Sequence, residues 1–213
     1  MHRTLSVLAG TTLLLGSAGV LGAQAAPETA PAAPVDPNAW VIDAGHSELS
    51  FRIRHFVSRV RGTFGKWQGS LIADPTNLAA GSVEVTIDAA SIDTQNEGRD
   101  NDLRSANFFE VEKYPTITFK STKVAVTGEN IEITGDLTMH GVTKPVVLKG
   151  RYNGMAKNQR GGDILGFEAS ATINRLEWGI TWNRMVEGMA RLGDDVEISI
   201  AVQAMKPRPR PAS

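Results

Sequence analysis

The sequence contains no cysteine, so disulfides and a thiol-linked lipid anchor are both excluded. It also lacks an excess of either charge: lysine and arginine number 22 and aspartate and glutamate 23, a formal net charge of −1. A chain without a basic surplus has no field that attracts nucleic acid. An exported protein of this composition must be stabilised by a hydrophobic core, and about 190 mature residues suffice for one.

Long hydrophobic runs are missing too, except at the amino terminus. Residues 5–22 form an apolar run that follows Arg3 and is interrupted by four glycines. The run ends in the small residues Ala23-Gln24-Ala25, a pattern typical of a cleaved export signal. A membrane anchor is the alternative, but we expect residues 1–25 to be a signal peptide that is cleaved near Ala25–Ala26.

The remaining chain divides by composition. Residues 26–38 are rich in alanine and proline and predict a flexible linker, residues 39–206 predict one domain, and residues 207–213 predict a disordered tail. The tail is basic, so weak contact with anionic lipid headgroups is its alternative role.

The domain has the pattern of β-strands. In residues 49–55 the odd positions are apolar and the even positions polar, which is the period of a half-buried strand. Similar runs occur at residues 64–71, 83–87, 117–119, 131–139, 146–152, 167–173 and 196–202. Turn-forming residues separate them. About eight strands with one apolar face form either a barrel or a sandwich, and the pattern alone leaves both open.

One segment predicts a short helix beside the sheet. Leu103 and Phe108 fit one side of a helix that begins at Arg99 and runs to about Phe109, while its charged residues face water. Pro115 has no amide hydrogen to donate, so we expect the helical segment to end before it.

Four blocks of the sequence resemble the YceI-like family of periplasmic polyisoprenoid-binding proteins. They are WVIDAGHSELSFRIRH at residues 40–55, RGTFGKWQGSL at 61–71, RDNDLRSANFFEVEKYPTITFKS at 99–121 and ITGDLTMHGVTKPVVL at 133–148. The resemblance implies an all-β fold, a lipocalin-like antiparallel β-barrel of about eight strands with a short helix packed beside it. It also implies a periplasmic protein that encloses a long isoprenoid chain.

The decisive question is whether the barrel is filled or hollow. An eight-stranded barrel holds either its own side chains or one small ligand. Together with the resemblance, the inward positions predict a deep apolar tunnel with one polar mouth, toward the upper end of about 300–1,000 Å³. The predicted lining residues are Phe51, Ile53, His55, Phe64, Leu71, Leu103, Phe108, Phe119, Leu137, Met139, Leu148, Phe167, Ala171, Ile173 and Ile198.

A polar head group would need its own contacts. The candidates are Arg59, Arg61, Arg99 and Arg104, because a guanidinium group binds phosphate through two hydrogen bonds. For each of them, a solvated surface charge is the alternative. Trp178 and Trp182 belong either to a satellite core or to a contact with a membrane or partner.

Catalytic readings are weak. His46-Ser47 and His55 include a hydroxyl and a base, but no nucleophile elbow is present. His46, His55 and His140 do not have the spacing of metal ligands. We therefore predict no enzyme activity, no catalytic residue, no metal and no cofactor other than a bound isoprenoid lipid.

The predicted function is non-catalytic binding, storage or transport of a long-chain isoprenoid, either a polyprenyl phosphate or an isoprenoid quinone. The alternatives are a stress-related interaction protein with a filled barrel and a quinone-linked redox partner. Transient membrane contact and a homodimer are compatible with the sequence, and nucleic acid is not an expected partner.

Overall fold

A computed structural model describes residues 36–183, 185–186, 189–190 and 192–207. The predicted signal peptide, residues 26–35 of the predicted linker and residues 208–213 of the predicted tail lie outside the described residues. In the part of the chain that is described, no helix has the length and apolar character needed to cross a membrane.

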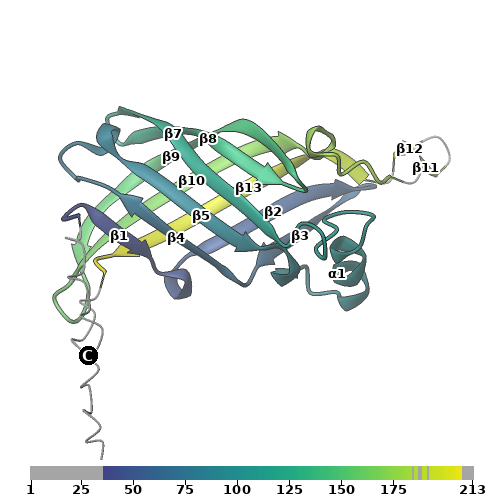
Figure 1. Cartoon of the computed structure of the whole chain (residues 1–213), viewed down its shortest axis with the longest axis horizontal. Coiled ribbons are helices and arrows are strands. Elements are labelled where there is room, and N and C mark those ends of the chain that lie inside the picture. Colours follow the sequence, from purple (N-terminus) through teal and green to yellow (C-terminus); the bar gives the residue numbers. More distant parts are fainter. Residues whose placement is uncertain (1–35, 184, 187–188, 191, 208–213) are drawn as a thin grey trace, which may run out of the picture. The chain divides into compact units, whose positions relative to one another are not determined.

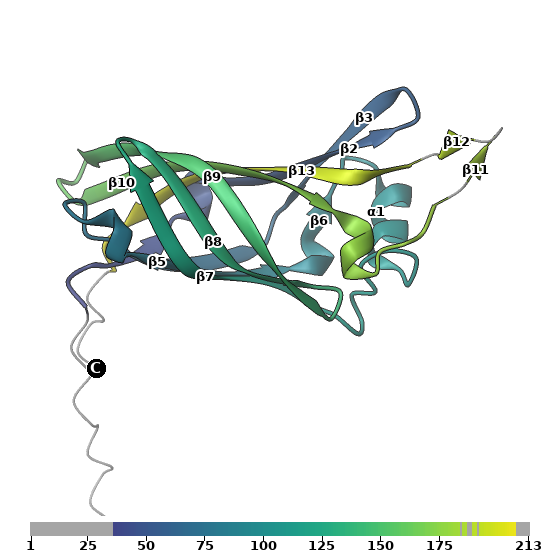
Figure 2. The same ribbon diagram turned by 90° about the horizontal axis from the view of Figure 1, so that it is seen from above.

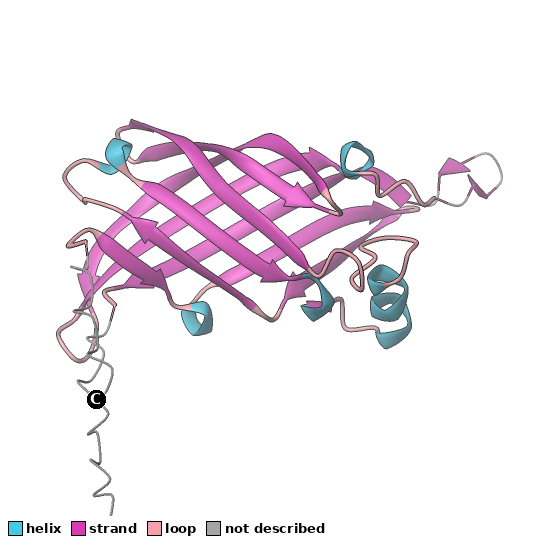
Figure 3. Ribbon diagram, in the orientation of Figure 1, coloured by secondary structure: helices cyan, strands magenta, loops and turns pink. Residues whose placement is uncertain are grey.

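Antiparallel strands make up most of the fold (Figures 1 and 3). The main sheet contains β1 (Ala39–Ile42), β2 (Glu48–His55), β3 (Ser58–Phe64), β4 (Trp67–Ile72), β5 (Ser82–Asp88), β6 (Ile92–Asp93), β7 (Thr116–Thr127), β8 (Asn130–Met139), β9 (Val142–Lys157), β10 (Asp163–Asn174) and β13 (Leu192–Met205). The short strands β11 (Met185–Val186) and β12 (Met189–Ala190) pair with each other. The helix α1 (Glu97–Arg104) is accompanied by the 3-10 turns η1 (Ala44–His46), η2 (Leu78–Ala80), η3 (Ala89–Ser91) and η4 (Arg175–Trp178).

The sheet closes on itself. Strands follow one another in the order β1-β4-β5-β7-β8-β9-β10-β13, and pairing of β1 with β13 completes a ring of eight. Val41 lies opposite Met205 and Ile42 opposite Ala204 at this closure. The predicted lipocalin-like antiparallel barrel with a short helix is therefore confirmed, and a sandwich is excluded because every strand of the ring has two neighbours.

Three long strands of the barrel are broken in two. β1 and β2 pair with successive parts of β13, β3 and β4 are separated by Gly65 and Lys66, and β5 and β6 are separated by η3. The single strand predicted over residues 64–71 is therefore wrong at its start, because β3 ends at Phe64 and β4 begins at Trp67. The breaks let β2 and β3 leave the ring at one end, as Figure 2 shows.

The helix is shorter than predicted. α1 ends at Arg104, since Ser105 takes an extended conformation and its hydroxyl donates to the Asp102 carbonyl at 2.6 Å. Phe108 therefore lies in the turn after the helix, and Pro115 is not the residue that ends it. At the other end Asn96 caps α1, because its side chain accepts a hydrogen bond from the Arg99 amide at 2.9 Å.

The inward glycines Gly135 and Gly150 do not leave empty space inside the barrel. A Cβ atom at Gly150 would lie 1.9 Å from the carbonyl oxygen of Glu168 on β10, so this glycine permits close approach of two strands. At Gly135 a Cβ atom would lie 2.5 Å from the ring of Phe119. Both spaces are already filled, and the cavity described below arises elsewhere.

The barrel interior contains two hydrophobic clusters of different character. One, called the closed end here, consists of Trp40, Ile42, Leu71, Ala73, Leu165 and Ala204. Leu165 and Ala204 are fully buried, and the Trp40 indole donates to the Ala73 carbonyl at 2.8 Å. The other cluster includes Phe119, Leu137, Met139 and Leu148, and many of its neighbours are only partly buried.

Candidate functional site

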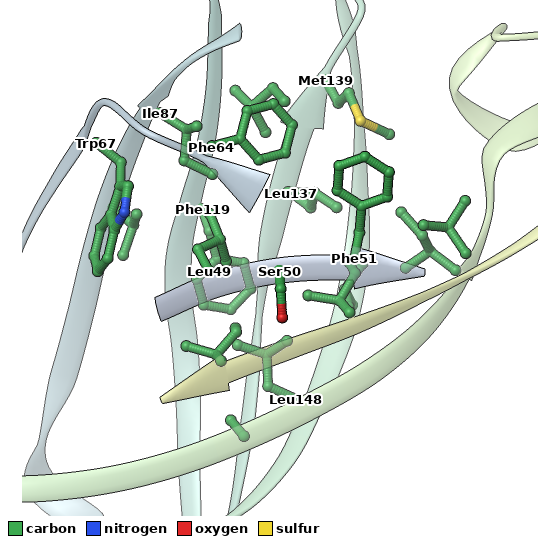
Figure 4. Close-up of a pocket in the computed structure, with 18 of the residues that line it drawn as sticks. Leu49, Ser50, Phe51, Phe64, Trp67, Ile87, Phe119, Leu137, Met139 and Leu148 are labelled. Atoms are coloured by element: carbon green, nitrogen blue, oxygen red, sulfur yellow. The ribbon is translucent and has the colours of Figure 1, made fainter. Parts of the chain in front are cut away.

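A cavity of about 660 Å³ lies inside the barrel. Inward side chains of the strands line it, and Figure 4 shows Phe119, Leu137 and Leu148 among them. Its volume is typical of ligand pockets and falls in the middle of their range, below the upper end that we expected. Apolar side chains dominate the wall because each strand presents alternate residues inward.

The predicted lining residues reach this wall with one exception. Phe51, Ile53, His55, Phe64, Leu71, Leu103, Phe108, Phe119, Leu137, Met139, Leu148, Phe167, Ile173 and Ile198 all line the cavity. Ala171 packs against the interior cluster but lies outside the cavity wall. It borders a separate polar depression that Arg52, Arg61 and Glu197 also line.

Sequence reasoning missed several parts of the wall. Many missed residues, such as Val83, Val85, Ile133 and Ile200, share the inward phase of strands that the alternation predicted. The alternation of side chains along these strands was therefore enough to predict that these residues turn toward the cavity. Trp182 and Phe109 also line the cavity, but they lie in segments without strand periodicity, so no comparable signal identified them.

Several polar lining residues come from one segment, and the part of the cavity beside it is called the polar end here; other polar residues, among them Glu168 and Arg175, line the cavity from other elements. Asn96, Gly98, Arg99 and Asp102 all come from α1 and its cap. Asn96, Gly98 and Arg99 lie at the amino terminus of α1, where the helix dipole favours negative charge, whereas Asp102 lies in its last turn. The cavity therefore combines a mainly apolar wall with a few polar groups at this end.

A buried hydrogen-bond network holds the polar end in place. The Asp100 carboxylate accepts from the Thr94 amide at 3.0 Å and from the Thr94 hydroxyl. Arg99 donates to the Thr94 hydroxyl at 2.7 Å and to the Thr94 carbonyl at 2.8 Å. Asp100 and Thr94 are both buried, so this network lies inside the protein and not on its surface.

The four candidate head-group arginines lie in different places. Only Arg99 lines the cavity. Arg59 pairs with Glu197, and Arg61 pairs with Glu48 at 2.8 Å, in both cases through exposed side chains. Arg104 donates to backbone carbonyls near β6. In this arrangement Arg59, Arg61 and Arg104 make no contact with the cavity.

A buried arginine that the head-group prediction did not include also reaches the cavity wall. Arg175 is 3% exposed and donates to the carbonyls of Gly193, Ile180 and Trp182 at 2.9, 2.6 and 2.9 Å. Burial lowers the pKa of its guanidinium group, and the Asp194 carboxylate partly opposes this effect. These bonds join η4 to the loop before β11 and to the start of β13, so Arg175 stabilises this side of the barrel.

Aromatic rings pack across the same end of the barrel. The rings of Phe108 and Trp182 lie 5.1 Å apart, and those of Phe109 and Phe64 lie 6.0 Å apart. Trp178 is buried, and its indole donates to the Leu137 carbonyl at 3.1 Å. Trp178 therefore belongs to the core, whereas Trp182 forms part of the cavity wall.

The three histidines among the described residues occupy separate environments. His46 ends η1 and bonds to Asp43 at 2.7 Å, His55 lines the cavity, and His140 lies at the β8–β9 turn 3.0 Å from the Trp178 carbonyl. The pKa of the Asp43 carboxyl is lowered, mainly because this carboxylate accepts a hydrogen bond from His46.

The fold and the site together define a class of protein: a closed antiparallel barrel with an internal apolar cavity that a short helical segment covers. Residues 40–204 match the YceI-like domain, and the chain belongs to this family. A UPF0312 protein of Pseudomonas aeruginosa is 40% identical over 162 residues, which are 76% of this chain and 82% of that protein. A UPF0312 protein of Vibrio cholerae is 39% identical over 145 residues, 66% of this chain and 77% of that protein.

Solved structures share the fold. The Campylobacter jejuni YCEI protein is 32% identical with a TM-score of 0.64, and the match covers 73% of this chain and 91% of that chain. A polyisoprenoid binding domain from Saccharophagus degradans implicated in plant cell wall breakdown is 14% identical with a TM-score of 0.62. That match covers 79% of this chain and 98% of the other, and at this identity it shows the fold alone.

Proposed function

We propose that the protein binds a long-chain isoprenoid lipid, a polyprenyl phosphate or an isoprenoid quinone, and stores or transports it without making or breaking a bond. The observation that carries this proposal is the predominantly apolar cavity of about 660 Å³, with Asn96, Arg99 and Asp102 of α1 and its cap among its few polar lining residues. Membership of the YceI-like family supports it, as does the shared fold with a domain that is described as polyisoprenoid binding. A barrel filled by its own side chains does not fit this cavity.

Transfer of apolar surface out of water drives binding in this proposal. Each methylene group that leaves water contributes about 0.8 kcal/mol. A bilayer offers the tail the same gain, so the membrane is the competitor, and the barrel must cover most of the tail to retain it. Of the four arginines predicted to contact the head group, we expect Arg99 to do so, because it alone among them lines the cavity.

The test is mass spectrometry of an organic extract from gently purified protein. We expect an isoprenoid lipid in the wild-type extract and its loss from Phe119→Arg, because a guanidinium group in the apolar wall is costly to bury. Val147→Arg is the matched control, since Val147 is exposed on β9 and lies outside the wall.

Circular dichroism separates loss of lipid from loss of fold, and Phe167→Arg provides a second wall position if Phe119→Arg does not fold. A folded variant that retains the lipid, or a wild-type extract without isoprenoid, would contradict the proposal. Ultraviolet absorbance of the extract distinguishes a quinone from a polyprenyl phosphate, and a redox-active head would favour the role of redox partner.

The same proposal places the protein in the periplasm, after removal of residues 1–25. Exchange of a lipid also requires transient contact with a membrane. Amino-terminal sequencing of protein released by osmotic shock tests the location and the cleavage near Ala25–Ala26. Light scattering of that protein tests whether it is a homodimer.

A further inference from the structure

The barrel wall has a discontinuity beside the polar end. β5 pairs with β7 as far as Asp88 opposite Thr116, and the Ala89 amide then donates to the Pro115 carbonyl at 2.9 Å. Beyond this point β6 pairs with β3, and no described strand pairs with its other edge. We call this unpaired edge, residues 90–94, the seam.

Side chains of α1 take the place of a strand along the seam. Arg104 donates through Nε to the Ala90 carbonyl and through Nη2 to the Ile92 carbonyl, both at 2.7 Å. Arg99 donates to the Thr94 carbonyl at 2.8 Å. The intervening carbonyl of Ser91 points the other way and accepts from the Gly65 amide at 3.0 Å. The Ile92 carbonyl belongs to the edge of β6 that does not face β3, and the Ala90 carbonyl in η3 and the Thr94 carbonyl after β6 accept beside it. The two arginines thus donate along an edge where a neighbouring strand would otherwise donate.

The segment that covers the seam also forms part of the cavity wall. Residues 97–114 contribute Leu103, Phe108 and Phe109 to the wall, and Figure 1 shows α1 at the end of the barrel beside β3. Phe109 contacts Phe64 and Phe108 contacts Trp182, in both cases through the aromatic rings. Displacement of this segment would therefore expose the cavity sideways.

We propose that the lipid enters and leaves through the seam when residues 97–114 move away, and that Arg104 is the positioning residue that keeps the seam closed. This inference rests on the proposed function. Movement along this edge breaks hydrogen bonds between side chains and backbone but leaves the β-ladders intact. Water replaces the lost donors at the exposed carbonyls, so the barrier is lower than for separation of two paired strands.

Arg104 is suited to a test because it does not line the cavity. Arg104→Gln removes the two bonds to the Ala90 and Ile92 carbonyls, and Arg104→Lys keeps the charge but offers a single ammonium group instead of a planar fork. Arg151→Gln is the matched control, because Arg151 is an exposed arginine on β9 that pairs with Glu129 at 2.7 Å.

The measurement is stopped-flow transfer of retinol, a fluorescent isoprenoid alcohol, from the protein to phosphatidylcholine vesicles. We expect transfer from Arg104→Gln to be about tenfold faster than from wild type, the effect of about 1.4 kcal/mol from two weakened hydrogen bonds. Arg104→Lys should restore part of the wild-type rate, and Arg151→Gln should match wild type. Hydrogen exchange should rise in residues 97–114 of Arg104→Gln while the ring strands stay protected.

The two proposals fail in different ways. Retinol binding with an unchanged transfer rate in folded Arg104→Gln would overturn the seam as the route. Faster transfer from Arg151→Gln as well would also overturn it, since the effect would then belong to surface charge. Wild-type protein that binds no retinol and yields no isoprenoid would overturn the proposed function and this inference together.

Discussion

The closed end and the polar end of the barrel are built from different interactions. At the closed end, Trp40, Leu165 and Ala204 are almost inaccessible to water and pack against one another. At the polar end, Arg99, Asp100 and Thr94 hold the chain through hydrogen bonds, and the apolar residues there border a cavity. The closed end stabilises the fold by burying apolar side chains against one another. The polar end keeps an internal space, so its apolar side chains are packed less completely.

The difference shows how one sheet supports both stability and binding. At the closed end β1 pairs on both sides, with β4 and with β13, so the ring closes there through strand pairing. Where the strands break, at Gly65-Lys66 and at η3, the wall cannot close through strand pairing alone. There the side chains of Arg99 and Arg104 donate hydrogen bonds to the backbone carbonyls in place of a strand. In our proposal these bonds can break without separating the strands of the barrel.

The largest expected effect compares the same substitution in the two regions. Leu165→Ala should lower the free energy of unfolding by about 4 kcal/mol, because it leaves a cavity in a fully packed site. Leu148→Ala, on the cavity wall, should cost about 2 kcal/mol, because the removed atoms already border empty space. Urea denaturation measures both. Equal losses would show that the two regions do not differ in packing.

The second-largest loss of stability is expected when the buried donor Arg175 is removed from the cavity wall. Arg175→Met keeps an unbranched apolar stem but leaves the carbonyls of Gly193, Ile180 and Trp182 without their donor. We expect a loss of about 3 kcal/mol in the free energy of unfolding. Arg160→Met serves as control, because Arg160 is an exposed arginine in the β9–β10 turn. A loss within about 0.5 kcal/mol of the control would contradict the structural role of Arg175.

A smaller effect is expected at the start of α1. Asn96→Ala removes the capping side chain from the Arg99 amide and should cost about 1 kcal/mol. The loss should be local, with faster hydrogen exchange in residues 97–104 and unchanged exchange at the closed end. Asn101→Ala, at an exposed position inside the helix, is the control. A uniform rise in exchange across the barrel would argue against independent behaviour of the two ends.

The smallest effect concerns Tyr152, whose ring packs 5.1 Å from Phe167 beside the closed end. Burial raises the pKa of this phenol above its ordinary value of 10.0. A group with a raised folded-state pKa contributes stability that is complete below the unfolded-state pKa and is lost as the pH rises through the folded-state value. Ultraviolet titration of wild type against Tyr152→Phe should show a phenolate that forms above pH 10.0. Formation at or below that pH would mean that water reaches this part of the barrel.

Strand alternation was sufficient to predict most of the wall. The inward phase of residues 49–55, 117–119 and 167–173 placed Phe51, Phe119 and Phe167 correctly, because side chains in a strand alternate strictly between two faces. Ala171 follows the same phase yet misses the wall, although Ala169 and Ile173 on either side of it in β10 reach the cavity. Period alone therefore predicts which side chains turn inward but not which of them reach the cavity surface.

The helix and the arginines were harder to predict. The length of α1 was overestimated because Leu103 and Phe108 fit a helical spacing, whereas the Ser105 side chain bonds to the Asp102 carbonyl and ends the helix. Four arginines looked alike as phosphate ligands, yet Arg59 and Arg61 pair with carboxylates on other strands. Their partners are distant in sequence, so local reasoning could not find them.

By itself the sequence determined the class of fold, the face of each strand that turns inward and the apolar character of the interior, because these follow from the local period of side chains along a strand. Only the tertiary structure decided that the interior is hollow, that α1 and its cap contribute polar residues to the cavity wall, and that Arg99 and Arg104 complete the wall at β6. Those features depend on the register in which distant segments meet and on where three long strands break, and no local pattern in the chain specifies either.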